Sequence, residues 1–261
     1  MDFVAKCHLV QVAVWDYLPC MIREWKNPKD YLFTTGLSPD QWAWEFLRRN
    51  PDYQREWSVF WDIWQALEAD YGSPPKRNYP AWKQDPRAFV VVGEGGEGDC
   101  RIEHDKVLIE CHLGARWGFH KFPPDPEMDD PAGEGRLSWR RVPLEAKLVD
   151  REDLSYLGSE PGKIALGFDL DRPLREQMER AKRFLQITQR QRIRQGSVKM
   201  VDVSLLKAEW TTFLRLLDGE ANGADSELLG RRLGIGDVDS ALSAARAMSR
   251  DGYRQIPQLS S

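Results

Sequence analysis

The sequence lacks any apolar run that approaches the roughly 18 residues needed to span a bilayer. Its start, Met1-Asp2-Phe3-Val4, also lacks the basic region of a secretory signal, and Lys6 and His8 interrupt the first apolar stretch. Four cysteines in 261 residues are too few and too scattered for a disulfide scaffold. We therefore expect a cytoplasmic protein without a membrane partner, whose cysteines are all reduced.

Catalytic motifs are missing as well. The sequence has no nucleophile elbow, no zinc-protease motif and no kinase signature set. The glycine-rich run Gly93–Gly98 lacks the Lys-Ser/Thr pair of a phosphate-binding loop, and its own acids, Glu94 and Glu97, would repel phosphate. We interpret it as a turn between strands, and we expect neither an enzyme nor a cofactor.

A metal site is also not expected. Cys100, His104, Cys111 and His112 offer four ligand types within a short stretch. However, zinc sites usually pair ligands two to four residues apart on each side of a longer loop. Adjacent residues on a strand point to opposite faces, so Cys111 and His112 would not reach one ion.

Strong net charge is absent, at −4 for the chain, but the charges are unevenly distributed. Acids outnumber bases between Glu94 and Glu160, whereas residues 175–199 carry eight Lys and Arg against two Glu. A local basic surface of this kind is what binding to nucleic acid requires.

Helices are the dominant expectation. Ser38-Pro39-Asp40-Gln41 is a capping box with proline at the first helical position, and Asn50-Pro51 starts a second helix with an aromatic face. Eleven tryptophans, mostly in the first half, predict an aromatic core there. The apolar segment from Val4 to Leu18 fits a strand or a helix equally well.

The middle of the chain predicts short strands and loops. Strands are expected over Ala88 to Val92, Lys106 to His112, Leu137 to Val142 and Lys163 to Leu170. The fold class is therefore α+β and mostly helical, with a Trp-rich helical/β domain followed by a helical domain.

The C-terminal region predicts a long basic helix and then three shorter helices, at about Val203 to Leu217, Asp225 to Leu233 and Val238 to Tyr253. Short helices joined by tight turns resemble a helix-turn-helix unit. Our candidate contacts to double-stranded DNA are four residues of the last helix and three of the basic helix: Ser243, Arg246, Arg250, Arg254, Arg190, Arg192 and Arg194. Spacing alone equally fits an ordinary three-helix cap and a solvated basic face.

Residues 42–57 resemble a known family. The proteobacterial transcriptional regulator-like domain has the run W-x-F-L-R-R-N-P-x-Y-x-x-x-W. A similar run in this chain is Trp44-Glu45-Phe46-Leu47-Arg48-Arg49-Asn50-Pro51-Asp52-Tyr53, which ends near Trp57. The stretches from Trp117 to Pro126 and from Leu137 to Arg140 are also similar to that family.

The C-terminal part resembles a helix-turn-helix variant family. The similar pieces are residues 168–174, 177–181, 213–218, 244–248 and 251–254. Proteins that join both domains resemble activators of excision and transfer genes in integrative conjugative elements. On this basis we expect an extension at 1–37, the regulator-like domain at 38–160, and the basic helix with the helix-turn-helix variant at 161–261.

Two functions follow from the resemblance. The first is a DNA-binding activator of a mobile element, in which the N-terminal domain serves protein contacts or a homodimer. The alternative is an antiactivator or adaptor that binds a partner protein without reading DNA. It is favoured by Asp237 and Asp239, because acids at the start of the last helix repel phosphates.

Overall fold

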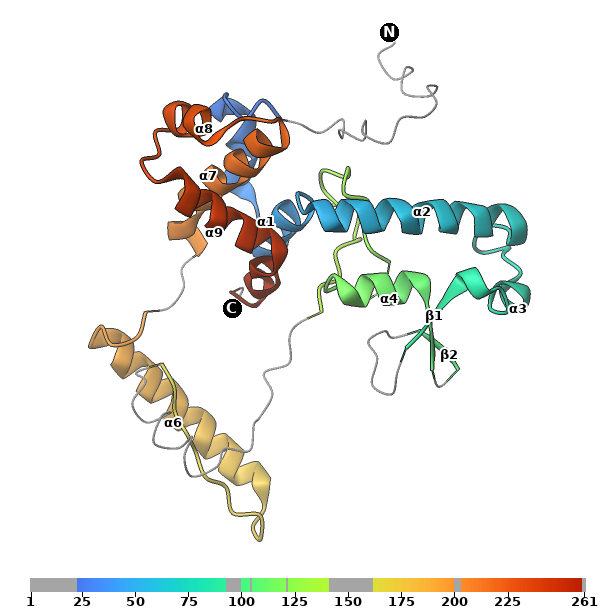
Figure 1. Cartoon of the computed structure of the whole chain (residues 1–261). Helices are drawn as coiled ribbons and strands as arrows, with labels where there is room; N and C mark the ends of the chain where they lie inside the picture. The colour runs from blue at the N-terminus through green and yellow to red at the C-terminus, as the bar shows by residue number, and fades with distance from the viewer. Residues whose placement is uncertain are drawn as a thin grey trace. The chain divides into compact units, whose positions relative to one another are not determined.

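The structure of the chain is a computed structural model that describes residues 23–92, 100–103, 105–120, 122–140, 162–199 and 203–259. It divides into two compact units (Figure 1). The main unit joins Met1–Arg141 to Leu206–Ser261, and the α6 unit comprises Val142–Leu205. Within the main unit, the last helices pack onto the N-terminal ones. The expected elements at 4–18 and 93–98 lie outside the described residues.

The fold is mostly helical with one small sheet, as the sequence predicts. The helices of the main unit's first segment are η1 (Pro28–Gly36), α1 (Pro39–Leu47), α2 (Pro51–Tyr71), α3 (Tyr79–Trp82), η2 (Pro86–Ala88) and α4 (Ile109–Arg116). Those of its second segment are α7 (Val203–Ala221), α8 (Ser226–Leu233), α9 (Val238–Arg250) and η3 (Gly252–Leu259). In the described residues, no helix is both long enough and apolar enough to cross a membrane.

The predicted caps form as expected. Ser38 accepts a hydrogen bond from the backbone N–H of Gln41, and the Gln41 side-chain oxygen accepts one from the backbone N–H of Ser38, which completes the capping box. Asn50 caps α2 through the backbone N–H groups of Asp52 and Tyr53. Gly72 ends α2 with a φ of 82°, a conformation that suits glycine.

The core of the main unit is aromatic and centred on α1. Every residue from Trp42 to Leu47 is buried, so α1 is covered on all sides rather than along one stripe. From α7, Trp210 meets Trp42 and Phe46 edge-on, with ring centroids 5.4 and 6.0 Å apart. Such edge-to-face contacts are the preferred geometry of aromatic pairs, and here they join the two segments of the main unit.

The proline-rich stretch at 122–126 packs on the aromatic face of α2. Tyr53 donates a hydrogen bond to the carbonyl of Pro124 at 2.5 Å, and the ring of Phe122 meets those of Phe60 and Trp64 edge-on. A proline-rich segment on an aromatic surface loses little backbone entropy when it binds. The loop is thereby fixed against α2.

The sheet has three short strands, β1 (Phe89–Val91), β2 (Arg101–Glu103) and β3 (Lys106–Leu108), in the order β1-β3-β2 with antiparallel pairing. The prediction of a strand as far as His112 is wrong, because α4 begins at Ile109. A short apolar run does not distinguish a strand from a buried helix, and here Ile109, Cys111 and Ala115 are buried as parts of α4. The described part of the expected strand at 137–142 forms a single bridge, from Trp139 to Phe119.

The cysteines differ from the expectation of four free thiols. Cys100 and Cys111 form a disulfide with a Cα–Cα distance of 5.9 Å, while Cys7 and Cys20 lie outside the described residues. Pairing of β2 with β3 brings the two together, since the carbonyl of Cys100 accepts a hydrogen bond from the backbone of Leu108. Among the described residues, no group of three or more potential ligands is placed to hold a metal ion.

In the described part of the α6 unit, the helix α6 (Leu174–Arg194) has residues 162–170 running beside it as an extended segment. The expected strand at 163–170 does not form, because no second strand pairs with this segment in the described residues. Gln177 attaches the segment to the helix: its amide accepts from the backbone N–H of Asp169 at 2.8 Å and donates to the Asp169 carbonyl at 2.9 Å.

Candidate nucleic-acid interface

A helix–turn–helix arrangement forms from α8 and α9. Asp225 caps α8 by accepting from the backbone of Leu228, and Gly234 ends it in the left-handed conformation, at φ 71°. The four residues from Gly234 to Asp237 form the turn, and Asp237 caps α9 by accepting from the backbone of Ser240. A turn of three or four residues containing glycine is typical of helix-turn-helix motifs.

Close packing fixes the angle between these helices. A Cβ atom on Gly230 of α8 would lie 2.8 Å from the Val238 side chain and 3.1 Å from the Ile235 carbonyl. A Cβ atom on Gly219 of α7 would lie 2.5 Å from the Leu229 side chain. The three helices therefore approach one another more closely than any larger residue would allow at these positions.

The predicted arginines of the last helix are placed differently from one another. Arg246 forms an ion pair with Glu220 of α7, and Arg254, which lies in η3, donates to the carbonyl of Arg116. Arg250 is exposed and has no ion pair with any described residue. Ser243 is exposed on α9, one turn before Arg246. Of the three guanidinium groups, that of Arg250 is the one without a partner in the described residues.

The acids at the start of α9 have structural roles. Besides the cap that Asp237 provides, Asp239 accepts a hydrogen bond from the Ser226 hydroxyl at 2.9 Å. Residues 218–259 carry seven Asp and Glu against five Arg, so the α8–α9 region is not basic. Its electrostatic contribution to contact with a polyanion is therefore small.

The strongest positive charge lies on α6. Residues 180–199 carry seven Lys and Arg and no acid. At about 100° per residue, Arg180, Arg183, Arg190 and Arg194 lie within about 80° of one another around the helix and extend over about 21 Å. All four are exposed. We call these four residues the basic stripe.

Arg192 is not part of the basic stripe, although the sequence prediction grouped it with Arg190 and Arg194. It lies about 120° from Arg180, on the side of α6 that faces the extended segment. There its Nη1 donates to the carbonyl of Lys163 at 3.1 Å. Our sequence prediction omitted Arg180 and Arg183, although the spacing 180, 183, 190 and 194 identifies one helix face.

An ionic cluster joins η1 and α1 to α7 inside the main unit. Asp218 accepts hydrogen bonds from Tyr31 at 2.5 Å and from Nε and Nη2 of Arg49 at 2.7 and 2.9 Å. Arg49 also contacts Glu45, whose side chain is 2 % exposed. Burial and the neighbouring Asp218 raise the pKa of Tyr31 above its usual value, so it stays a donor. Burial alone would lower the pKa of Arg49, but Asp218 and Glu45 together raise it.

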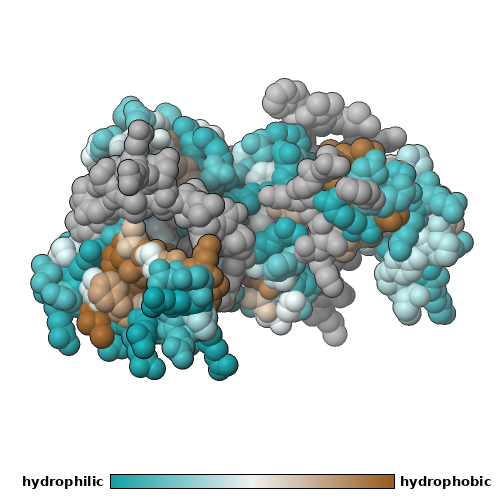
Figure 2. Space-filling model, turned by 90° about the horizontal axis from the view of Figure 1, so that it is seen from below, coloured by the Kyte–Doolittle hydropathy of each residue, from teal (hydrophilic) through white to brown (hydrophobic). Residues whose placement is uncertain are grey.

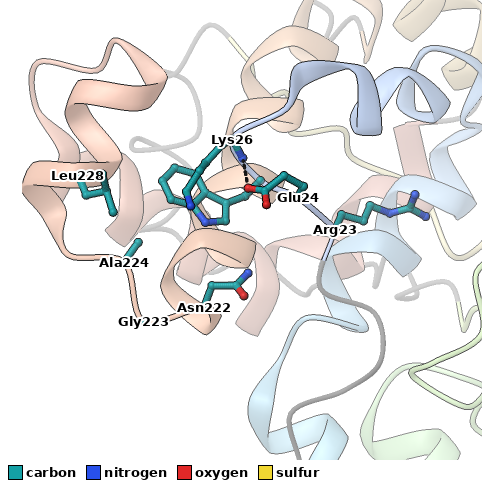
Figure 3. Close-up of a pocket in the computed structure, with 8 residues that line it drawn as sticks. Arg23, Glu24, Lys26, Asn222, Gly223, Ala224 and Leu228 are labelled. Carbon is teal, nitrogen blue, oxygen red and sulfur yellow. Dashed lines mark hydrogen bonds between the residues drawn. The ribbon is translucent and has the colours of Figure 1, made fainter.

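A pocket of about 350 Å³ lies beside the α7–α8 turn (Figure 3). Figure 3 shows Glu24 and Lys26 on one side, joined by a hydrogen bond from the Lys26 backbone, and Asn222 and Gly223 of the turn on the other. This volume is at the lower end of the range for ligand sites, and we assign no ligand to it.

The helices α7, α8 and α9 pack closely against one another, and a four-residue turn joins α8 to α9. Residues 24–67 match the proteobacterial transcriptional regulator-like domain family. This confirms the resemblance of the N-terminal motif and associates the chain with transcriptional regulation. No curated protein and no solved structure matches the chain.

The match begins at residue 24, so it includes residues 24–37, which were expected to form part of an N-terminal extension. It does not reach the C-terminal pieces, whose resemblance to the helix-turn-helix variant family stays a prediction. Residues of this stretch contact α7: Tyr31 in η1 donates a hydrogen bond to Asp218, and the carbonyl of Trp25 accepts one from Arg215.

Three consecutive residues of the matched motif stabilise the fold of the main unit through hydrogen bonds. Arg48 donates to the carbonyl of Pro126 at 3.1 Å, Arg49 binds Asp218, and the Asn50 amide donates to the carbonyl of Ser249 at 3.0 Å. Neighbouring residues of the run thus bind three separate parts of the main unit. Because these side chains are engaged inside the protein, they are not available for contact with DNA.

Proposed function

We propose that the chain is a transcriptional regulator that binds double-stranded DNA, with α6 contacting phosphates and α9 presenting Arg250 to the duplex. The observation that carries this proposal is the basic stripe, a row of four exposed arginines within residues 180–194, which contain no acid. Arginine is suited to phosphate because its planar guanidinium donates two hydrogen bonds at once. The helix-turn-helix-like pair α8–α9 supports the same function.

The finer proposal is an activator of excision or transfer genes of a mobile element, acting in the cytoplasm and without catalysis. It is supported by the family match together with the resemblance of the C-terminal pieces. The main unit packs the matched residues against the helix-turn-helix-like helices. This suits such a regulator, because a partner that binds one segment can change the position of the other.

The test is fluorescence anisotropy with DNA from upstream of the chain's own gene, titrated at salt concentrations from 50 to 200 mM. Each phosphate contact contributes about 0.9 to the slope of log K against log salt. We expect the Arg190→Ala/Arg194→Ala variant to lower this slope by about 1.8. Substitution of all four stripe arginines should lower it by about 3.6.

The matched control removes two arginines of the main unit that are ion-paired on the surface. Arg55 pairs with Asp52 and Arg136 with Glu134, and both side chains are more than half exposed. The Arg55→Ala/Arg136→Ala variant removes the same charge and should leave the slope unchanged. If both double variants change the slope equally, the effect is one of net charge and the proposed stripe is wrong.

A second candidate function, a protein-binding adaptor or antiactivator, is favoured by the acidic balance of the α8–α9 region and by the intramolecular contacts of Arg246 and Arg254. It predicts no DNA binding at 50 mM salt together with a protein partner retained on the immobilised chain. Detectable binding to DNA that depends on the basic stripe would decide against it.

A further inference from the structure

The α6 unit exposes an unusual share of apolar surface. Of the fifteen large hydrophobic side chains that are exposed among the described residues, nine lie on α6 and the extended segment beside it. No residue of α6 is buried. Figure 2 shows hydrophobic residues gathered on one face of this part of the chain. An amphipathic helix gains most of its stability by covering its apolar face, so this face is suited to a partner.

The apolar face forms one wall of a groove. Met178, Ala181 and Leu185 lie on one side of α6, and Leu166 and Phe168 of the extended segment lie opposite. The groove encloses about 710 Å³, and the Gln177 hydrogen bonds hold its two walls together. Leu174, Met178, Ala181 and Leu185 follow the alternating spacing of four and three residues that lets one helix pack along another. The basic stripe lies on the opposite side of α6, about 170° away.

The charges around the groove indicate the chemistry of its occupant. Lys182 and Arg192 lie among the groove residues, together with the single acid Glu179. Residues 162–199 as a whole carry ten Lys and Arg against four Asp and Glu. In paired helices, the charges of residues that flank the apolar seam determine which partner helix binds. Here the flanking positions include Arg175 and Lys182. A second copy of α6 would place like charges next to each other, which repel. A helix with acidic residues at its flanking positions would instead be attracted to these basic residues.

We propose that this groove binds an amphipathic helix of a partner protein whose apolar stripe is flanked by acidic side chains. The apolar residues of that helix enter between α6 and the extended segment, and its acids face Lys182 and Arg175. The interaction uses the side of α6 that the proposed DNA contact does not use. Whether or not the chain binds DNA, binding of the partner helix can therefore be tested independently.

The probe is a fluorescein-labelled synthetic helical peptide with Leu along one stripe and Glu at the flanking positions. Its matched control carries Lys at the same flanking positions. We expect the full chain to bind the acidic peptide at least tenfold more tightly than the basic peptide, as measured by anisotropy. The Met178→Ser/Leu185→Ser variant should lose at least tenfold in affinity for the acidic peptide and keep the salt slope of DNA binding.

Two charge reversals at adjacent positions provide a test that does not depend on the apolar substitutions. Lys182→Glu changes the charge beside the groove, and Arg183→Glu makes the same change on the opposite side of α6. We expect Lys182→Glu to weaken the acidic peptide at least fivefold more than Arg183→Glu does. Circular dichroism of both variants checks that the helix is retained.

Three results would overturn the proposal. The first is equal binding of the two peptides, or equal effects of the two charge reversals. The second is a dimer in sedimentation experiments that the Met178→Ser/Leu185→Ser variant dissociates, which would assign the groove to a second copy. The third is a tenfold gain in peptide affinity when residues 142–161 are replaced by a Gly-Ser linker. That gain would indicate that this segment of the chain, and not a partner protein, occupies the groove.

Discussion

The carboxylate of Asp218 provides the most direct test of how the two segments of the main unit are held together. It is the common acceptor for Tyr31 of η1 and Arg49, which follows α1, and it lies on α7. The Asp218 side chain is 9 % exposed and that of Arg49 is 10 % exposed. The substitution Asp218→Ala therefore removes the shared acceptor of two buried donors, the Arg49 guanidinium and the Tyr31 hydroxyl.

The expected cost follows from what remains. Removal of one member of a buried ion pair typically costs about 3–5 kcal/mol. Arg49 retains its contacts with Glu45, so we expect the lower end, about 3 kcal/mol, for Asp218→Ala. By contrast, Arg55→Ala breaks an exposed pair with Asp52 and should cost less than about 1 kcal/mol. The double substitution Arg49→Met/Asp218→Leu should cost less than the sum of its single substitutions.

Urea unfolding followed by tryptophan fluorescence suits this experiment. None of the eleven tryptophans belongs to Val142–Leu205, so the signal does not arise from the α6 unit. Trp42 and Trp210 stand on either side of the junction between the two segments. A cost below about 1 kcal/mol for Asp218→Ala, equal to that of Arg55→Ala, would refute the reasoning that this cluster joins the segments.

Two further predictions concern stability. Burial raises the pKa of Glu110 from its usual value of 4.5 to about 6. Because the buried carboxyl group resists ionisation, the free energy of unfolding falls as pH rises from 4.5 through 6. Glu110→Gln should therefore stabilise the protein by up to about 2 kcal/mol at pH 8 and have little effect at pH 4, as measured by urea unfolding at both pH values. Gly230→Ala introduces a Cβ atom 2.8 Å from the Val238 side chain, which should cost about 1–2 kcal/mol after the gain in helix propensity. Gly36→Ala, which meets nothing within 4 Å, is its control, and equal effects would contradict the close packing of α8 and α9.

Local features of the fold were predictable because their causes lie within a few residues. The capping box at Ser38, the cap at Asn50 and the glycine that ends α2 follow from side chains that bond to the neighbouring backbone. The helices α6, α8 and α9 follow from the period of their apolar residues. The short strand before Ile109 was extended too far, because an apolar run of this length has no decisive period.

The candidate interface was predicted in part. The basic helix was recognised from its charge, and its periodicity already separates Arg192 from Arg190 and Arg194. The intramolecular contacts of Arg246 and Arg254 were not predictable, since Glu220 and Arg116 are 26 and 138 residues away. No local pattern indicates which exposed-looking arginine meets a distant acceptor.

The sequence by itself determined the helices, their caps, the row of arginines on α6 and the regulator-like motif, because each depends on spacing along the chain. The tertiary structure alone decided that the last helices complete the N-terminal core. It also decided that the motif residues Arg48, Arg49 and Asn50 act as internal contacts. The physical reason is that a buried charge or amide needs a partner, and only the packed chain brings that partner, 78 to 199 residues away, within hydrogen-bonding distance.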